Sequence, residues 1–253
     1  KMPPLKALAI YEDFKELTPA GAQGDAIIRK LADRLVAVDL LDRAGALLEN
    51  QVKTRLTGID QARVAAQLAL VRLLDHRPQD SLNALDLPVQ GSLPQDLARQ
   101  RAELRGRALT ELGKTDDALK ILDGDDSADA DRLRSDIYAK AGKWPQLVSL
   151  LQKNLKPPAV DGTIDADTAS TVLRIATAMV LGKDHTGLDT LQKRYGTAMD
   201  QGAYKDAFRV IAGSSGADTT TFRTLADRVA QISDLQSFMS NYRQRVQQDK
   251  LST

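Results

Sequence analysis

The chain has 253 residues, of which 35 are lysine or arginine and 34 are aspartate or glutamate, so the charges nearly cancel. This balance argues against a nucleic-acid-binding protein, which usually carries a basic excess, and an aromatic content of 4% leaves few stacking platforms for single strands. The absence of cysteine excludes disulfides, thiolate catalysis and zinc–thiolate sites, and the apolar runs are too short to span a membrane.

The hydrophobic pattern predicts an all-α protein. Alanine and leucine are abundant, whereas the period-two alternation that marks strands is nearly absent. The last expected helix has one apolar and one polar face, which suits a terminal cap on a helical stack; a helix that docks into a partner's groove is the alternative. In chain order, we expect helices at residues 4–16, 24–38, 40–55, 59–75, 79–86, 94–112, 115–122, 128–141, 144–155, 166–181, 185–195, 201–212 and 218–247.

A recurring turn pattern indicates internal repeats. Five stretches begin with a turn residue, at Asp39, His76, Gly113, Gly142 and Gly182, and these residues lie 37, 37, 29 and 40 positions apart. Such spacings are typical of helix–turn–helix repeats. Five positions after each turn comes a mostly small residue, and four positions later a leucine. The mostly small positions are Ala44, Ser81, Ala118, Leu147 and Gly187.

This pattern resembles the tetratricopeptide repeat, in which small residues let paired helices approach closely. The opening stretch resembles the second helix of that repeat, because Ala7, Tyr11, Phe14 and Pro19 have its small–aromatic–apolar–proline spacing. The resemblance extends to about residue 196 and implies an all-α, right-handed α–α superhelix of helical hairpins with a carboxyl-terminal capping helix. It also implies that the first repeat is truncated.

The resemblance makes further predictions about organisation. The repeat array is expected to cover residues 1–156, and degenerate repeats and the capping helix are expected to continue it over residues 157–253. Because a solenoid repeat buries its apolar face on its neighbours, part of the face formed by Leu8, Tyr11 and Phe14 is expected to be exposed. Arg105 and Arg134 depart from the family pattern, since they stand where a large apolar residue is preferred.

A narrower resemblance concerns location. Three stretches, "YEDFKELTP", "GDAIIRKLADRLVAVDLLDRAGALLENQV" and "ISDLQSFMSNYRQRVQ", are similar to the carboxyl-terminal part of large tetratricopeptide-repeat proteins of alphaproteobacteria. That group includes many exported members, so the resemblance implies a bacterial protein of the periplasm or cell envelope. The cysteine-free composition itself fits the cytoplasm equally well.

The sequence contains no catalytic module. The tripeptide "GKT" ends like a phosphate-binding loop, but Ala108 stands where the first glycine of that loop is required. The two histidines, His76 and His185, lie in predicted turns without a second imidazole at metal-binding spacing, and no nucleophile elbow occurs. We therefore expect no enzymatic activity, no cofactor and no metal.

The acidic stretch at residues 123–136 resembles a calcium-binding loop. Asp125, Ser127, Asp129 and Asp136 have EF-hand-like spacing, but Ala130 replaces the mid-loop glycine, and the short Asp136 replaces the bidentate glutamate. We interpret the stretch as a loop whose carboxylates stabilise the start of the next helix.

The family resemblance implies a non-enzymatic scaffold that binds a protein or peptide partner in a concave groove lined by the first helix of each repeat. Four of the implied contact residues are arginines from four consecutive first helices, so we expect a partner of acidic character. The simpler interpretation is a solvated helix face. Carried over residue by residue, the contact positions are Arg29, Asp33, Arg63, Gln100, Glu103, Arg107, Arg132 and Asp136.

The alternative function is structural. The array would then act as a spacer, or as a module that forms a homo-oligomer through exposed terminal repeats. Neither nucleic acid nor direct membrane insertion is expected.

Overall fold

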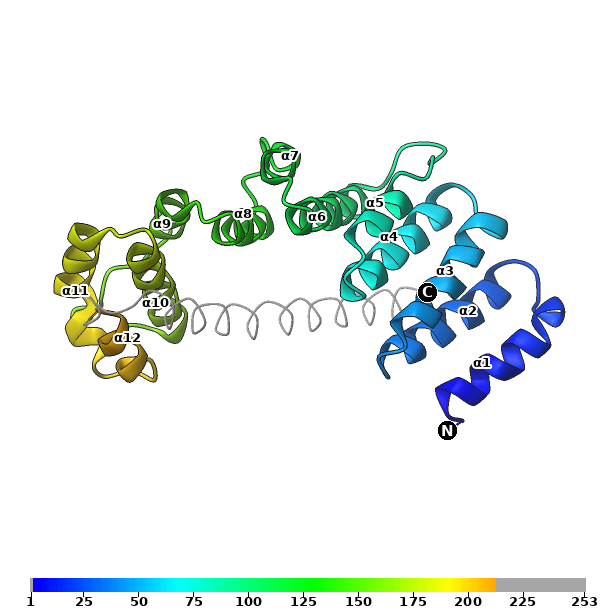
Figure 1. Ribbon diagram of the computed structural model, residues 1–253, viewed down its shortest axis with the longest axis horizontal. Coiled ribbons are helices and arrows are strands. Elements are labelled where there is room, and N and C mark those ends of the chain that lie inside the picture. Colours follow the sequence, from blue (N-terminus) through cyan, green and yellow to red (C-terminus); the bar gives the residue numbers. More distant parts are fainter. Residues whose placement is uncertain (1, 213–253) are drawn as a thin grey trace. The chain divides into compact units, whose positions relative to one another are not determined.

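The computed structural model describes residues 2–212, and every regular element in that range is helical (Figure 1). The all-α prediction is confirmed for these residues, whereas the predicted capping helix at 218–247 lies outside them. One short 3-10 helix, η1, covers Lys15–Leu17. The α-helices are α1 (Pro4–Asp13), α2 (Ala22–Val36), α3 (Leu41–Thr54), α4 (Gly58–Leu74), α5 (Pro78–Leu85), α6 (Gln95–Glu111), α7 (Thr115–Ile121), α8 (Ala128–Lys140), α9 (Trp144–Gln152), α10 (Ala166–Leu181), α11 (His185–Met199) and α12 (Lys205–Ala212).

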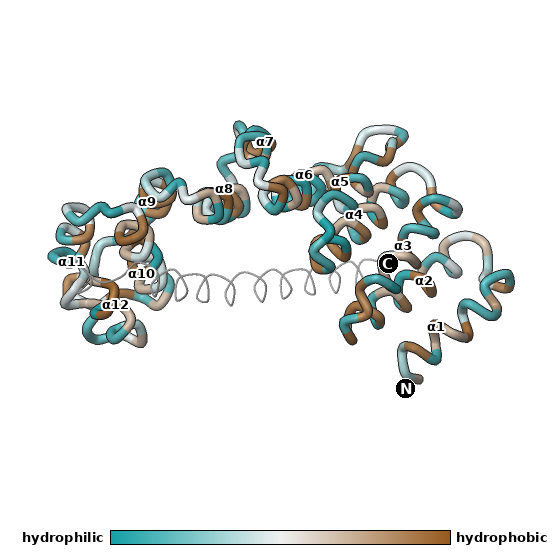
Figure 2. Tube along the Cα trace, in the orientation of Figure 1, coloured by the Kyte–Doolittle hydropathy of each residue, from teal (hydrophilic) through white to brown (hydrophobic). Residues whose placement is uncertain are grey.

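The described residues divide into two compact units, an N-terminal unit of residues 2–141 and a C-terminal unit of residues 142–212. In each, helices pack mainly on their neighbours in the sequence, an arrangement compatible with a helical repeat. The predicted change of organisation lay after residue 156, but α9 packs on α10 and therefore belongs to the C-terminal unit. Apolar and polar segments alternate along the labelled helices in Figure 2, as expected when one side of each helix is buried.

The turns between paired helices have the left-handed conformation. Asp39, His76, Gly113 and Gly142 have φ values of 61°, 55°, 72° and 66°, and the next helix begins two residues after each of them. A left-handed residue after a helix redirects the chain and lets its backbone bond back to the last carbonyls. The first four predicted repeat starts are therefore real turn positions, although two of them are not glycine.

The fifth repeat was predicted one residue out of phase. Gly182 has an ordinary φ of −81°, and the left-handed residue is Lys183, with a φ of 58°. Five positions after Lys183 comes Leu188, which is buried, so it replaces Gly187 as the inward-facing residue of the second helix. Gly187 instead donates its N–H to Asp184 Oδ1 at 2.8 Å, which caps the start of α11.

The inward-facing small residues lie where paired helices meet. Ala44 on α3 and Ala118 on α7 have no exposed surface. We expect Ala44→Leu and Ala118→Leu each to lower the free energy of unfolding by about 1–3 kcal/mol, because the added methylenes overfill a packed interface. Urea unfolding measures the change. Ala46→Leu on the exposed side of α3 is the matched control, and equal stability of the Ala44 variant and the control would contradict the repeat alignment.

Ser81 occupies the same inward position on α5. It is fully buried, and its hydroxyl oxygen has no hydrogen-bond partner among the described residues. A buried hydroxyl without a partner costs free energy, so we expect Ser81→Ala to raise the free energy of unfolding by about 1 kcal/mol. The exposed loop substitution Ser92→Ala should leave it unchanged. A loss of stability in Ser81→Ala, measured by urea unfolding, would show that the hydroxyl is bonded.

Helix α1 packs on α2 through one side only. Leu8 is buried and Tyr11 is half-buried, whereas Phe14 is 58% exposed, so the predicted partial exposure of this face is found at Phe14 and not at Leu8. Several other large apolar side chains of this segment are also exposed to solvent. They are Met2, Leu5, Ile10 and Leu17.

The core of the C-terminal unit lies between α10, α11 and α12. Tyr195 of α11 is buried in it, and its hydroxyl donates to the main-chain carbonyl of Lys156 at 3.0 Å. This bond fixes the long segment between α9 and α10 against the core, since a buried tyrosine hydroxyl is stable only with a partner.

Candidate functional site

The first helices of the N-terminal unit, α2, α4, α6 and α8, are neighbours in space. Gln67 Nε2 of α4 donates to Asp33 Oδ1 of α2 at 2.8 Å. Helix α6 packs against both α4 and α8, and Arg107 Nη1 of α6 lies 3.9 Å from Asp136 Oδ2 of α8. The predicted binding residues therefore come from adjacent elements, and we call the surface they share the first-helix face.

The centre of this face is a short chain of charges. Arg107 Nη2 donates to Glu103 Oε1 at 3.3 Å, one helical turn away, and the same guanidinium reaches Asp136. All three side chains are half-buried, at 18–26% exposure, so solvent screens their interaction less than it screens an open surface pair. The structure thus brings together three of the eight predicted residues.

The other predicted arginines have local partners or neighbours. Arg63 lies 3.6 Å from Asp60 on α4, and Arg132 lies 2.9 Å from Asp129 on α8. These side chains are exposed, and exposed pairs at this spacing contribute little to stability. The face is therefore mixed in charge.

Arg29 and Gln100 complete the predicted set, and both are half-buried. Arg29 lies on α2 near Asp25, and its charge helps to lower the pKa of that carboxyl. Gln100 lies on α6, one turn before the Glu103–Arg107 pair. Neither residue joins the central chain of charges, but both lie on first helices as predicted.

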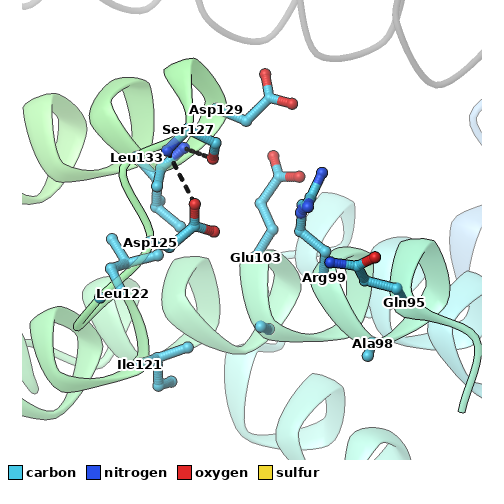
Figure 3. Close-up of a pocket in the computed structure, with 13 residues that line it drawn as sticks. Gln95, Ala98, Arg99, Glu103, Ile121, Leu122, Asp125, Ser127, Asp129 and Leu133 are labelled. Atoms are coloured by element: carbon cyan, nitrogen blue, oxygen red, sulfur yellow. Dashed lines mark hydrogen bonds between the residues drawn. The ribbon is translucent and has the colours of Figure 1, made fainter.

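A cleft opens beside this face, between α6 and the segment that leads from α7 into α8 (Figure 3). Its volume is about 440 Å³, and Glu103 is the predicted residue that lines it. We call it the α6–α8 cleft. Its polar lining consists of Gln95, Arg99, Glu103, Asp125, Ser127 and Asp129, and its apolar lining includes Ala98, Ala102, Ile121, Leu122, Ala130 and Leu133.

The wall of the cleft on the α8 side is held by capping bonds. Ser127 N–H donates to Asp125 Oδ1 at 2.9 Å, and Ser127 Oγ accepts from Ala130 N–H at 3.2 Å. These bonds fix the entry into α8, as expected of a serine N-cap. Hydrogen bonding from Ser127 lowers the pKa of the Asp125 carboxyl, and the charges of Arg99 and Arg134 lower it further, so Asp125 is ionised at neutral pH.

The acidic stretch does not gather its carboxylates around one point. Asp129 pairs with Arg132, and Asp136 lies near Arg107. Within residues 2–212 there is no group of three or more histidine, cysteine, aspartate or glutamate side chains placed to hold a metal ion. Nor does any helix of that range have the length and apolar character needed to cross a membrane.

The sequence did not reveal the arginines that hold the helix ends together. Arg134 Nη2 donates to the main-chain carbonyls of Leu122 and Asp125 at 2.6 and 2.7 Å, beyond the last turn of α7. Arg105 Nη2 lies 2.6 Å from Asp86 and 3.3 Å from the Leu85 carbonyl, at the end of α5. The sequence did contain a signal for these contacts, namely an arginine at a position where the repeat pattern prefers an apolar residue. A cation at such a position can bind the carboxyl-terminal end of a neighbouring helix, because helix carboxyl-terminal ends attract cations.

Comparison with known proteins gives no match, since no family model, curated protein or solved structure is significantly similar to this chain. The tetratricopeptide resemblance therefore rests on the repeat pattern alone.

Proposed function

We propose that the N-terminal unit is a non-enzymatic protein–protein interaction module that binds a partner polypeptide along the first-helix face. The proposal assumes a right-handed, tetratricopeptide-like superhelix in which this face is concave. The observation that carries it is the continuity of the face: side-chain contacts join α2 to α4 and α6 to α8, and α4 packs on α6. An extended ligand would thus meet polar groups from the first helices of four consecutive repeats, α2, α4, α6 and α8.

The charges of the face point to a ligand of mixed charge. Arg63, Arg107 and Arg132 each have a carboxylate within 4.0 Å. A purely acidic ligand would have to displace these carboxylates and would also meet their repulsion. A ligand that carries both acids and bases can replace both partners of each pair, so we propose this chemistry as a refinement of the partner of acidic character expected from the row of arginines.

The test begins with capture of partners from a native bacterial extract, followed by titration of a captured polypeptide. The double variant Arg107→Ala with Arg132→Ala should bind it about tenfold more weakly, a loss of about 1.4 kcal/mol. Binding by the parent should also weaken with added salt, because exposed charges are screened.

The matched control removes two exposed cations from second helices, Arg43 on α3 and Lys120 on α7, by substitution with alanine. This control should bind like the parent. Equal binding by parent and by the Arg107/Arg132 variant would exclude the first-helix face as the binding surface.

One observation favours the structural alternative, a spacer or self-association module. The α1–η1 segment exposes several large apolar side chains, among them Ile10 and Phe14. Exposed apolar patches frequently mark interaction sites. Sedimentation equilibrium distinguishes the two functions: an oligomer that Ile10→Ser with Phe14→Ser dissociates would support self-association, and a monomer at all concentrations would favour the binding module.

We also propose a location in the periplasm or envelope of a bacterial cell. This rests only on the similarity of the stretches "YEDFKELTP", "GDAIIRKLADRLVAVDLLDRAGALLENQV" and "ISDLQSFMSNYRQRVQ" to alphaproteobacterial proteins with many exported relatives. Cell fractionation tests it, and recovery of the protein in the cytoplasm would contradict it.

A further inference from the structure

We infer that the α6–α8 cleft receives the side chain of a lysine or arginine from the bound polypeptide. This inference rests on the proposed function and adds the chemistry of one ligand residue to it. Three features of the cleft carry it: its apolar floor, the excess of carboxylates around its rim, and its position beside the Glu103–Arg107–Asp136 chain of charges.

The floor of the cleft suits the aliphatic part of a long side chain. Ala98 and Ala102 of α6, Ile121 and Leu122 at the end of α7, and Leu133 of α8 line it. Lysine and arginine bury their methylene stems on such apolar surface while the charged end stays among polar groups. A volume of about 440 Å³ leaves room for one such side chain and some water.

The rim of the cleft carries the complementary charge. Glu103, Asp125 and Asp129 contribute three carboxylates to the lining, and Arg99 contributes one guanidinium. Arg107 and Arg132 pair with Glu103 and Asp129 from outside the lining, so the carboxylates, and not these two arginines, face the cleft. In Figure 3, Glu103 and Arg99 project from α6, and Asp125 and Asp129 lie on the opposite wall. A cation that enters between these walls therefore meets carboxylates on both sides.

The carboxylates can accept further hydrogen bonds. Asp125 accepts from Ser127, Glu103 from Arg107 and Asp129 from Arg132. An ionised carboxylate has about four acceptor sites, so one bond leaves capacity for a ligand donor. Charge-assisted bonds of this type are about twice as strong as neutral ones.

Other occupants fit the lining less well. An acidic side chain would be repelled by the three carboxylates of the lining, and a purely apolar one would remove water from them without replacing their hydrogen bonds. The methylene stem of a basic side chain can pack on the apolar floor while its charged end binds the carboxylates of the rim, so electrostatic complementarity selects a basic residue.

The experiment uses the full chain and two short peptides of equal size, acetyl-Gly-Arg-Gly-amide and the same peptide with citrulline in place of arginine. Citrulline keeps the shape of arginine and removes its charge. Methyl-labelled NMR spectra report binding through the signals of Ile121, Leu122 and Leu133. We expect the arginine peptide to shift these three signals in a saturable way, with a dissociation constant in the millimolar range, and the citrulline peptide to bind about tenfold more weakly.

A variant pair completes the test. Glu103→Gln with Asp129→Asn removes two rim charges and should weaken binding of the arginine peptide about tenfold. The control, Asp96→Asn with Glu111→Gln, makes the same change in net charge on exposed positions of α6 outside the cleft and should bind like the parent.

The inference is overturned if the two peptides bind equally, if the arginine peptide leaves the three methyl signals unchanged, or if the rim variant and its control behave alike. These results are separable from a failure of the proposed function. Peptide binding in the cleft without any captured polypeptide would contradict only the module. A captured polypeptide whose binding leaves the methyl signals of Ile121, Leu122 and Leu133 unchanged would contradict only this inference.

Discussion

Arg101→Ala is expected to lower the free energy of unfolding of the N-terminal unit by about 3–4 kcal/mol, because it removes two hydrogen bonds and leaves a cavity. Arg101 of α6 is only 9% exposed. Its Nη1 donates to the main-chain carbonyl of Ala62 on α4 at 2.8 Å, and its Nη2 to that of Leu85, the last residue of α5, at 2.7 Å. One side chain thus joins three helices.

Loss of the Arg101 side chain affects its two acceptor carbonyls differently. Ala62 lies inside α4, where its carbonyl also has a helical partner, whereas the Leu85 carbonyl is one of the last four of α5 and has none within the helix. Arg101 therefore acts as a side-chain cap for α5. Desolvation lowers the pKa of Arg101, which shows that burial of its charge opposes these bonds, and the nearby charge of Arg105 lowers it further.

A second variant separates packing from hydrogen bonding. Arg101→Met keeps most of the stem and removes only the donors, so we expect it to lose about half as much stability as Arg101→Ala. Arg99→Met, at an exposed position two residues earlier, should change the free energy of unfolding by less than about 0.5 kcal/mol. Urea unfolding followed by circular dichroism gives all three values. If Arg101→Met were as stable as the wild type, the free-energy cost of burying the guanidinium charge would equal the stabilisation from its two hydrogen bonds.

Sequence patterns located the helices and turns of this chain because both are locally determined. The left-handed turns at Asp39 and His76 were found without glycine, since the spacing of small and leucine residues around them repeats. The misplacement of the fifth turn, at Gly182 in place of Lys183, also comes from a local sequence pattern. The Gly–Lys dipeptide recurs at Gly113, Gly142 and Gly182, but in the last case the left-handed residue is the lysine, because Gly182 is the right-handed C-cap of α10 and its N–H bonds to the Ala178 carbonyl.

The candidate site was predicted only as far as helix faces. Sequence spacing places Asp33, Glu103, Arg107 and Asp136 on first helices, and the structure agrees. It cannot show that Gln67 bonds to Asp33, or that Arg107 lies between Glu103 and Asp136, because these contacts depend on how successive helices stack. The mixed charge of the face follows from those contacts.

The buried arginines were beyond sequence reasoning for a different reason. Arginine is almost never fully buried, so Arg101 by itself gave no sign of a buried position. Arg105 and Arg134 differ, because they stand where the repeat pattern prefers an apolar residue. The groups that accept from Arg101 are main-chain carbonyls, which every sequence supplies at every position. Only the folded structure, in which the end of α5 packs on α6, shows that the Leu85 carbonyl needs a side-chain donor.

Asp25 links α2 to the end of α3 through a buried ion pair with Arg55. Arg55 Nε donates to Asp25 Oδ1 at 2.8 Å, and Gln51 Nε2 donates to the same oxygen at 3.3 Å. Arg55 Nη2 also donates to the carbonyl of Pro19 at 2.7 Å, in the segment before α2. The Asp25 side chain is 8% exposed, so removing its charge leaves the Arg55 guanidinium without its charged partner. Gln51 keeps a second acceptor, because its Nε2 also donates to the main-chain oxygen of Asp25 at 3.1 Å.

The pKa of Asp25 sets the pH range in which this pair stabilises the protein. Burial alone would raise the pKa, but hydrogen bonds from Arg55 and Gln51 and the charges of Arg55 and Arg29 bring it below the ordinary value of 3.8. A carboxyl whose pKa is lower in the folded state contributes its full stability above the pKa of the unfolded chain. That contribution is lost as the pH falls through the folded pKa. The pair therefore stabilises the protein at neutral pH and fails in acid.

We expect Asp25→Asn to lower the free energy of unfolding at pH 7 by about 3 kcal/mol, the lower end of the range for a broken buried ion pair, because Arg55 remains partly exposed. Urea unfolding of the wild type and the variant should be compared at pH 7 and at about pH 3. The difference between them should shrink at the lower pH, because the unfolded wild-type chain binds the proton of Asp25 before the folded protein does. Asp13→Asn, an exposed loss of the same charge, should show a change of less than about 0.5 kcal/mol at both. A deficit in Asp25→Asn that stays constant with pH would show that its cause is packing of the side chain and that the ion pair adds nothing.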